Sequence, residues 1–291
     1  MATEKLVVCV SHSPGMERDQ EQVQGLGFRA GLKEARRMVA DFAPDWVVLV
    51  GGDHRRTFRK TVPAFAVAFS AGIMAEAGYP RGGLKVPEGI ARGLVEDLLA
   101  KNFDVSACRN VDFDHAFAQP LRVLMDGLDV VPVIPVAVNC ATPPLPSASR
   151  VLAFGRAIGE FLDRQGGRVL IIGSGGLSHS PPSLEVETYD LGDEERARLI
   201  SEGSEAAKRK VRPEWDEALL DALSDWGEEQ LVELVDNATE LGGVGANEVR
   251  TWLTAAAAGG EALETIAYEP VPDWITGMGV TASTTRGRGH Q

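Results

Sequence analysis

The sequence predicts a single α/β domain: a central, largely parallel sheet flanked by helices, plus a helical segment near the functional site. Short runs rich in Val and Ile alternate with amphipathic helical patterns, which is typical of βαβ units. The 291 residues are enough for one large domain with its own core, and no internal repeat or long linker divides them. We therefore expect one domain over residues 1–285 and a disordered tail over 286–291.

The first half of the chain opens with a strand, a helix and a second strand. Residues 5–10 form a β-branched run that predicts a buried strand. Apolar residues recur at helical spacing over 28–42, and Pro44 ends that helix before the apolar run 46–50. Further strands are expected at 64–69, 103–108 and 131–138, with a helix at 88–100.

The second half predicts one more strand among helices. A helix is expected over 149–164, followed by a strand at 168–172 that leads into a glycine-rich loop. Residues 185–240 are acidic and helical, and apolar residues from Trp215 to Trp226 stand at helical spacing. This stretch is the helical segment that we expect over or beside the site.

Composition excludes several classes of protein. The formal net charge of −13 argues against a nucleic-acid partner, since a phosphate backbone favours basic surfaces. No apolar run approaches the ~20 residues of a membrane span, and no secretory signal is evident, so we expect a cytoplasmic protein without a membrane partner. Cys9, Cys108 and Cys140 are far apart, which predicts small apolar residues and no disulfide framework.

Four of the five histidines stand in loop-like stretches rich in Gly, Ser, Asp or Pro. His12, His54 and His179 follow predicted strands, and His115 lies in a similar polar stretch. In open α/β sheets, ligands bind outside the carboxyl ends of the strands. We therefore expect these histidines to converge in one crevice.

A histidine cluster of this kind predicts a metal site. Imidazole suits Fe, Zn, Cu and Ni, and two histidines with one carboxylate form the triad of non-haem Fe(II) oxygenases. His12 and His54 are a candidate pair, but spacing does not select the acid. Asp53 and Asp114 each neighbour a histidine, where they could ligate the metal or orient the imidazole.

The loop Gly173–Gly176 offers two weaker hypotheses. A nucleotide site is disfavoured because the loop lacks the Lys-[Ser/Thr] end of a P-loop and Ser178 replaces the third glycine of a Gly-x-Gly-x-x-Gly pattern. A serine hydrolase is disfavoured because Ser174 does not stand in Gly-x-Ser-x-Gly register. The glycines instead favour close approach of backbone to a ligand beside His179.

Six segments spread along the chain carry a resemblance to a known family. They are VVCVSHSP (7–14), VVLVGGDH (47–54), DHAFAQPL (114–121), GSGGLSHSPP (173–182), NEVRTW (247–252) and PVPDWITGMG (270–279). Together they resemble the class III extradiol ring-cleavage dioxygenases of the LigB-type superfamily, most closely the 2,3-dihydroxyphenylpropionate 1,2-dioxygenase branch. The resemblance runs in order from about residue 7 to 284, and its most specific segments are DHAFAQPL and GSGGLSH.

The resemblance implies a role for each site residue. It makes His12, His54 and Glu248 the metal ligands, and His115 and His179 the acid–base pair, with His179 mainly as base and His115 as acid. Glu248 precedes an Ala-rich helical stretch that would hold it in place. The region between Pro182 and Trp215 looks shorter than in that branch, which implies different pocket walls.

The resemblance also implies the reaction and its partners. A catechol similar to 2,3-dihydroxyphenylpropionate and O₂ would meet at Fe(II), with Mn(II) or Zn(II) as other candidate metals, and the ring would open beside the hydroxyls. A homo-oligomer is expected. The alternatives are the same chemistry on a gallate, protocatechuate or aminophenol type of substrate, a zinc hydrolase using the same ligands, and a metal-free binding relative.

Overall fold

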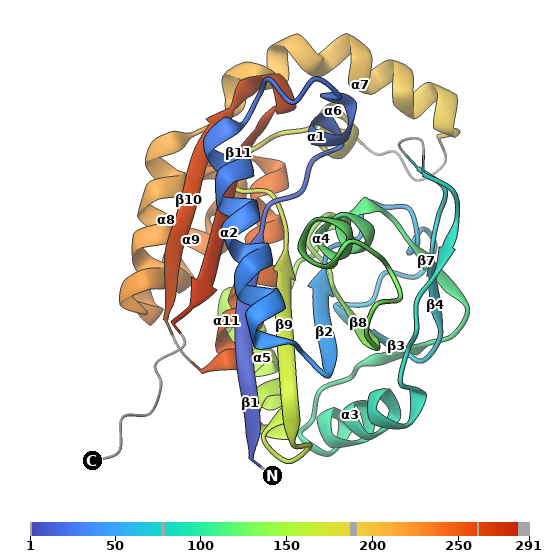
Figure 1. Ribbon diagram of the computed structural model, residues 1–291. Coiled ribbons are helices and arrows are strands. Elements are labelled where there is room, and N and C mark those ends of the chain that lie inside the picture. The colour runs from blue at the N-terminus through green and yellow to red at the C-terminus, as the bar shows by residue number, and fades with distance from the viewer. Residues whose placement is uncertain (1, 77–78, 187–190, 261, 285–291) are drawn as a thin grey trace.

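An eight-stranded sheet forms the middle layer of the structure (Figure 1). The computed structural model describes residues 2–76, 79–186, 191–260 and 262–284. The strand order is β10-β11-β1-β9-β2-β8-β3-β6. The strands are β1 (Thr3–Val10), β2 (Trp46–Gly51), β3 (Phe65–Ala68), β6 (Ser106–Cys108), β8 (Val133–Val138), β9 (Gly167–Ser174), β10 (Leu263–Val271) and β11 (Thr276–Ser283). A small second sheet has the order β5-β4-β7, from β4 (Ala71–Ile73), β5 (Gly82–Gly83) and β7 (Val111–Phe113).

The centre of the large sheet is parallel, as the alternation of strands and helices predicts. β1 pairs with β9, β9 with β2, and β2 with β8, all in parallel. The antiparallel hairpin β10–β11 extends the sheet beyond β1 and was not expected from the sequence. β10 is half-exposed and has a register irregularity, and the buried β11 is rich in small residues, so neither shows a clear strand periodicity.

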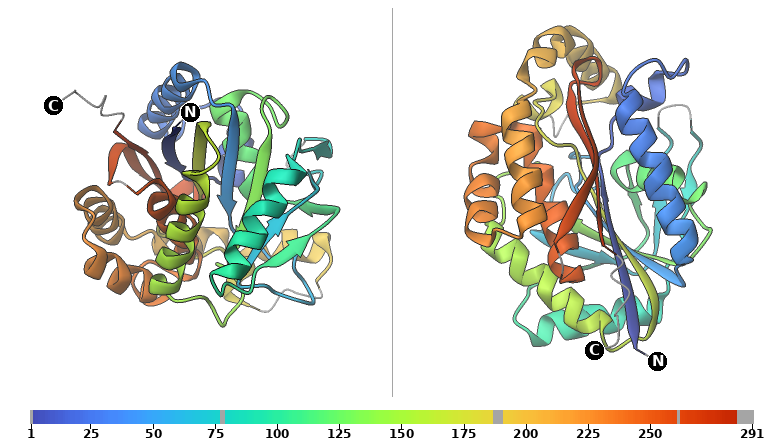
Figure 2. Two further views of the ribbon diagram at one scale, coloured as in Figure 1. Left: turned by 90° about the horizontal axis from the view of Figure 1, so that it is seen from below. Right: turned by 60° about the vertical axis from the view of Figure 1, so that its left-hand side comes forward.

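Helices cover both faces of the sheet, which Figure 2 shows edge-on. Alternate side chains of each strand point to opposite faces, so Leu6 and Val8 pack in one core, and Val7 and Cys9 in the other. The first core holds α2 (Leu26–Phe42) and α4 (His115–Met125). The second holds α3 (Glu88–Ala100), α5 (Ala148–Leu162), α8 (Pro213–Asp225), α9 (Glu228–Asp236) and α11 (Val249–Gly259).

Most expected elements form close to their expected bounds, including the helix at 88–100. The strand expected at 103–108 is shorter, beginning at Ser106, because the Phe103 amide donates to the Leu98 carbonyl and closes the end of α3. The acidic region 185–240 is helical, as expected. It contains α7 (Asp193–Ala207), the 3₁₀ turn η1 (Lys208–Lys210), α8, α9 and α10 (Ala238–Leu241), after the short α6 (Pro182–Glu185).

Three further expectations concern the tail, membrane-spanning helices and the cysteines. The tail over 286–291, with His290, lies outside the described residues. Among the helices of the described segments, none has the length and apolar character needed to cross a bilayer. The three cysteines are free, with Cys9 and Cys140 buried and Cys108 half-buried.

Candidate active site

Three neighbouring strands end at one level and deliver three of the four histidines. Val10 of β1 and Gly51 of β2 both stand in register with Ser174 of β9, so the loops after these strands leave the sheet at the same edge. His12 and His54 follow β1 and β2, and their Nε2 atoms lie 3.4 Å apart. The expected convergence at the carboxyl ends of parallel strands is therefore present in the fold.

The other ring nitrogen of each histidine is held by a neighbour. Ser174 Oγ donates its proton to the Ala116 carbonyl (2.6 Å) and so accepts from His12 Nδ1 (2.8 Å). His54 Nδ1 donates to the Asp114 carboxylate (2.9 Å). Both histidines thus present Nε2 to the centre of the site, an orientation typical of metal-ligating histidines.

Glu248 reaches the same point from the opposite end of the chain. It ends the 3₁₀ turn η2 (Val244–Glu248) before α11, and its oxygens lie 2.9 Å from His54 Nε2 and 3.4 Å from His12 Nε2. The Gly176 amide donates to this carboxylate (2.7 Å). Gly175 allows the close approach, because a Cβ there would lie 2.8 Å from the Glu248 backbone oxygen.

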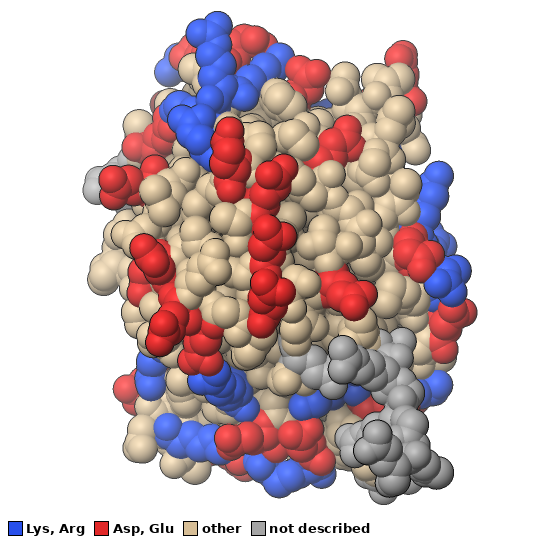
Figure 3. Space-filling view, turned by 90° about the vertical axis from the view of Figure 1, so that its left-hand side faces the viewer, with Lys and Arg blue, Asp and Glu red and all other residues tan. Residues whose placement is uncertain are grey.

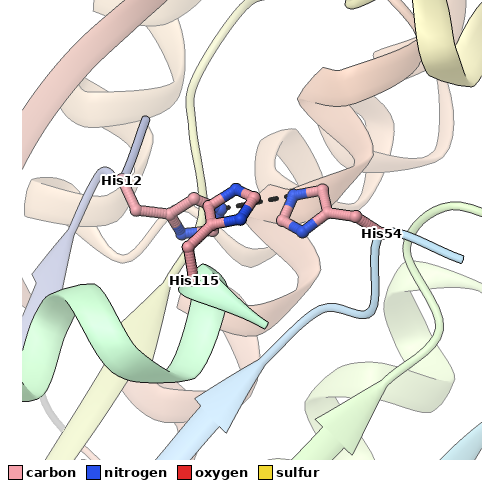
Figure 4. A group of neighbouring side chains, drawn as sticks. All are labelled: His12, His54 and His115. Atoms are coloured by element: carbon pink, nitrogen blue, oxygen red, sulfur yellow. Dashed lines mark hydrogen bonds between the residues drawn. The ribbon is translucent and has the colours of Figure 1, made fainter. Parts of the chain in front are cut away.

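His115 corrects one expectation, because it does not lie in a loop. It is the first residue of α4, and the Asp114 side chain caps that helix by accepting from the Ala116 amide (3.0 Å). The Glu76 carboxylate accepts from both the Nδ1 and the amide of His115, at 3.0 Å each. Figure 4 shows the three rings of His12, His54 and His115 meeting from separate elements.

His179 also lies close to Glu248. Its Nδ1 donates to the Leu177 carbonyl (2.8 Å), and its Nε2 lies 3.5 Å from Glu248 Oε1. Glycines at 176 and 245 lie against the ring, and a Cβ on either would overlap it. The ring orientation is therefore fixed by a hydrogen bond and by close packing.

The pKa directions show that burial and neighbouring charges act differently on the three residues. Burial lowers the pKa of His12 to about 3, so this imidazole is neutral. Burial also disfavours charge on His54, but Asp114 and Glu248 outweigh it and hold the pKa of His54 well above its usual range. Burial opposes ionisation of Glu248, yet His179, His12 and His54 hold its pKa well below normal. A divalent cation between these groups would meet the same electrostatic field.

Sequence reasoning missed two carboxylates that support the histidines. Glu76 lies in an irregular segment that carries no motif. Asp216 lies in α8, where the sequence does not distinguish it from the other acidic residues of an amphipathic helix. Asp216 is fully buried and accepts from the Ser178 amide (2.6 Å), the Ser178 hydroxyl (2.8 Å) and the Tyr268 hydroxyl (2.8 Å). It thereby anchors the residue that precedes His179.

One cavity of about 230 Å³ opens onto the site. All four histidines line it. Its walls come from α1 (Pro14–Arg18), from α7 and from the 3₁₀ turn η3 (Pro272–Trp274) with the residues that follow it. The helical segment expected near the site therefore contributes a wall of its cavity.

Comparison with known proteins decides the family. The family described as the catalytic LigB subunit of aromatic ring-opening dioxygenase matches residues 6–279. The chain belongs to this family. It is an extradiol aromatic ring-opening dioxygenase, in a family that uses Fe(II) and acts on catecholic substrates with O₂.

The dioxygenase is similar over nearly its whole length to proteins named 2,3-dihydroxyphenylpropionate/2,3-dihydroxicinnamic acid 1,2-dioxygenase. One from Klebsiella pneumoniae is 34% identical, with 95% of this chain and 98% of that protein covered. One from Rhodococcus is 34% identical, with 94% and 96% covered. The crystal structure of an uncharacterized Escherichia coli K12 protein shares the fold, at a TM-score of 0.61 and 17% identity, covering 96% of this chain and 99% of that one.

The residues present fit an iron site. Donor atoms of His12, His54 and His115 lie within 4.8 Å of one another, and Glu248 contacts the first two of them. Two ligand sets can therefore be drawn in this dioxygenase. They share His12 and His54, and differ in whether Glu248 or His115 is the third ligand.

Proposed function

We propose that this dioxygenase opens the ring of a catechol that carries a short side chain, similar to 2,3-dihydroxyphenylpropionate, beside its two hydroxyls. The observation that carries the proposal is the meeting of His12, His54 and Glu248 on a cavity that His115 and His179 also line. The names of the relatives support the substrate. The paired imidazoles support proton transfer to and from it.

Ring orientation favours Glu248 as the third ligand. An imidazole nitrogen directs its lone pair in the plane of the ring. The rings of His54 and His115 are stacked, 4.5 Å apart and inclined by 13°, so their lone pairs lie in two nearly parallel planes and do not converge on one point between the rings. The rings of His12 and His54 are inclined by 86°, and their Nε2 atoms face each other. His12, His54 and Glu248 would therefore hold the metal, which leaves His115 for acid–base chemistry.

Iron at these three ligands would supply open coordination positions at which catechol and O₂ are held close to each other. The surrounding side chains handle the protons. His179 carries its proton on Nδ1, bonded to the Leu177 carbonyl, so its Nε2 can accept a phenolic proton. His115 donates from Nδ1 to the Glu76 carboxylate, which fixes its ring and leaves Nε2 for proton transfer. This arrangement supports His179 as base and His115 as acid.

The test is ring cleavage by the iron-reconstituted protein. Iron is added under anaerobic conditions, and O₂ uptake and the yellow ring-opened product are followed with 2,3-dihydroxyphenylpropionate, gallate, protocatechuate and 2-aminophenol. We expect the first to give the highest kcat/KM. A higher kcat/KM for any of the other three compounds would show that the proposed substrate class is wrong and would indicate that compound's class instead. A protein that takes up no iron and opens no ring would overturn the proposal in favour of a metal-free relative.

A further inference from the structure

Three arginines line the cavity, and two of them have partners within the protein. Arg56 pairs with Glu76 (3.3 Å). Arg196 is buried and donates to the backbone carbonyls of His54 (3.1 Å) and Arg55 (3.4 Å). The side chains of both arginines are therefore already engaged by other groups of the protein.

Arg18 differs from these two. It ends α1, it is exposed, and no described residue gives its side chain a hydrogen bond or ion pair. The two acidic side chains on the cavity wall are engaged elsewhere: Glu76 by His115 and Arg56, and Asp273 by Lys208 (3.0 Å). The guanidinium of Arg18 is thus a cation on the cavity wall that no acid in the described segments neutralises.

The position of Arg18 suits a group attached to the ring of a substrate. α1 begins directly after His12, with Ser13 as its N-cap, and ends at Arg18, which lines the same cavity as the histidines. Arg18 lies one turn beyond Pro14, or ~6 Å along the helix axis at 1.5 Å per residue. An aromatic ring at the histidines would therefore direct a short substituent along α1 toward Arg18.

The wall beside Arg18 has a second unsatisfied donor. Trp274 packs with its indole edge against Gly15, which stands three residues before Arg18 on the same side of α1. Its Nε1–H is buried and has no hydrogen-bond partner among the described residues. Trp274 also lines the cavity, so its indole is part of the wall beside Arg18.

We propose that Arg18 binds an anionic group, a carboxylate, on the side chain of the catechol and so selects anionic over neutral catechols. This inference rests on the proposed function and adds the residue that reads the substituent. Arginine suits the task because its planar guanidinium can donate two parallel hydrogen bonds to a carboxylate.

The test compares two catechols whose side chains differ only in the terminal group, which is charged in one and neutral in the other. 2,3-Dihydroxyphenylpropionate and 3-propylcatechol have chains of equal length, and the second ends in a methyl group. In the iron-loaded protein, Arg18→Gln should lower kcat/KM for the acid about tenfold more than for propylcatechol, as expected for loss of a charge-assisted hydrogen bond. Arg18→Lys should restore part of the preference.

A matched control is Arg198→Gln, on the exposed side of α7, where Arg198 pairs with Glu202. It should leave the preference unchanged. Raising the salt concentration should raise KM for the acid in the wild type and have little effect on it in Arg18→Gln.

Equal effects of Arg18→Gln on both catechols, or no effect on either, would overturn the role of Arg18 while ring cleavage itself stands. A wild-type protein that opens neither catechol would overturn the proposed function instead. The two failures are therefore distinguishable.

Discussion

Glu248 and His115 both contact His54, and each could complete a metal site with it. The hydrogen bonds separate their roles. His115 is tied to Glu76 through Nδ1, whereas the Glu248 carboxylate directly faces both His12 and His54. We infer that one acts as ligand and the other as acid.

Two substitutions test this difference. Glu248→Ala should abolish iron binding, because one of three ligands is lost. His115→Ala should retain iron and lose ~10²–10⁴-fold in kcat, the usual contribution of a general acid or base. Iron content after anaerobic reconstitution, with steady-state kinetics, measures both. The reverse pattern, with iron lost only from His115→Ala, would assign His115 as the ligand.

Asp216 gives a prediction about pH and stability. Burial raises its pKa from 3.8 to about 6 in the folded protein. The native state therefore holds an extra proton between about pH 4 and 6, and the free energy of unfolding falls as pH rises through that window. The contribution is about 3 kcal/mol at ~1.36 kcal/mol per pKa unit.

The side chain introduced by Asp216→Asn cannot titrate. The free energy of unfolding of this variant should therefore not show the fall that Asp216 causes in the wild type between about pH 4 and 6. Urea unfolding at a series of pH values measures the difference from wild type. Asp221→Asn, on the exposed side of the same helix, is the control and should follow the wild type. A constant difference between Asp216→Asn and wild type from pH 4 to 6 would contradict the prediction.

At the scale of elements, the site depends on strands and turns that end at the same place. β1, β9 and β2 supply His12, His179 and His54, and η2 brings Glu248 against the glycines after β9. The packing is close enough that a single methyl group should disturb it.

Gly245→Ala tests this packing, because its Cβ would overlap Nε2 of His179. We expect iron content to stay at the wild-type level and kcat to fall roughly 10²-fold, the cost of displacing a reacting group by about 1 Å. Gly89→Ala is the control, since no atom lies within 4 Å of a Cβ there. A wild-type kcat in Gly245→Ala would contradict this prediction, because it would show that a shift of His179 does not slow the reaction.

At the scale of the whole molecule, the proposed iron site joins distant parts of the chain. His12 and His54 lie in the loops after β1 and β2, and Glu248 ends η2, so bound iron would link three segments that separate on unfolding. At a free iron concentration 100 times Kd, the native state should gain about 2.7 kcal/mol.

We therefore expect iron to raise the unfolding temperature of the wild type by roughly 5–10 °C, at ~2–4 °C per kcal/mol for a chain of this size. Calorimetry under anaerobic conditions, with and without Fe(II), measures the shift. Glu248→Ala should show little of it. An iron-independent unfolding temperature in the wild type would contradict a site built from these elements.

One face of the molecule shows how its charged side chains are distributed. Figure 3 shows a face on which Asp and Glu gather in the middle, with Lys and Arg toward the top and bottom. The net charge of −13 gives no general attraction for an anionic substrate. Selection of a carboxylate therefore has to depend on a local cation, and Arg18 is the candidate.

Much of the fold could be predicted from local pattern. The periodicity of 88–100 and the β-branched run at 46–50 specify helix and strand whatever they contact. The β10–β11 hairpin could not be predicted, because its strands are stabilised by pairing with β1 more than by their own pattern.

The sequence by itself determined the α/β class, the histidines at the strand ends and, through its resemblance, the family and the candidate role of Glu248. Only the tertiary structure decided that His115 begins a helix, that Glu76 and Asp216 support the histidines, and that Arg18 lines the cavity without an acidic partner. The physical reason is that periodicity and motifs act over a few residues, whereas ligand geometry, burial and charge pairing depend on residues that are far apart in the sequence.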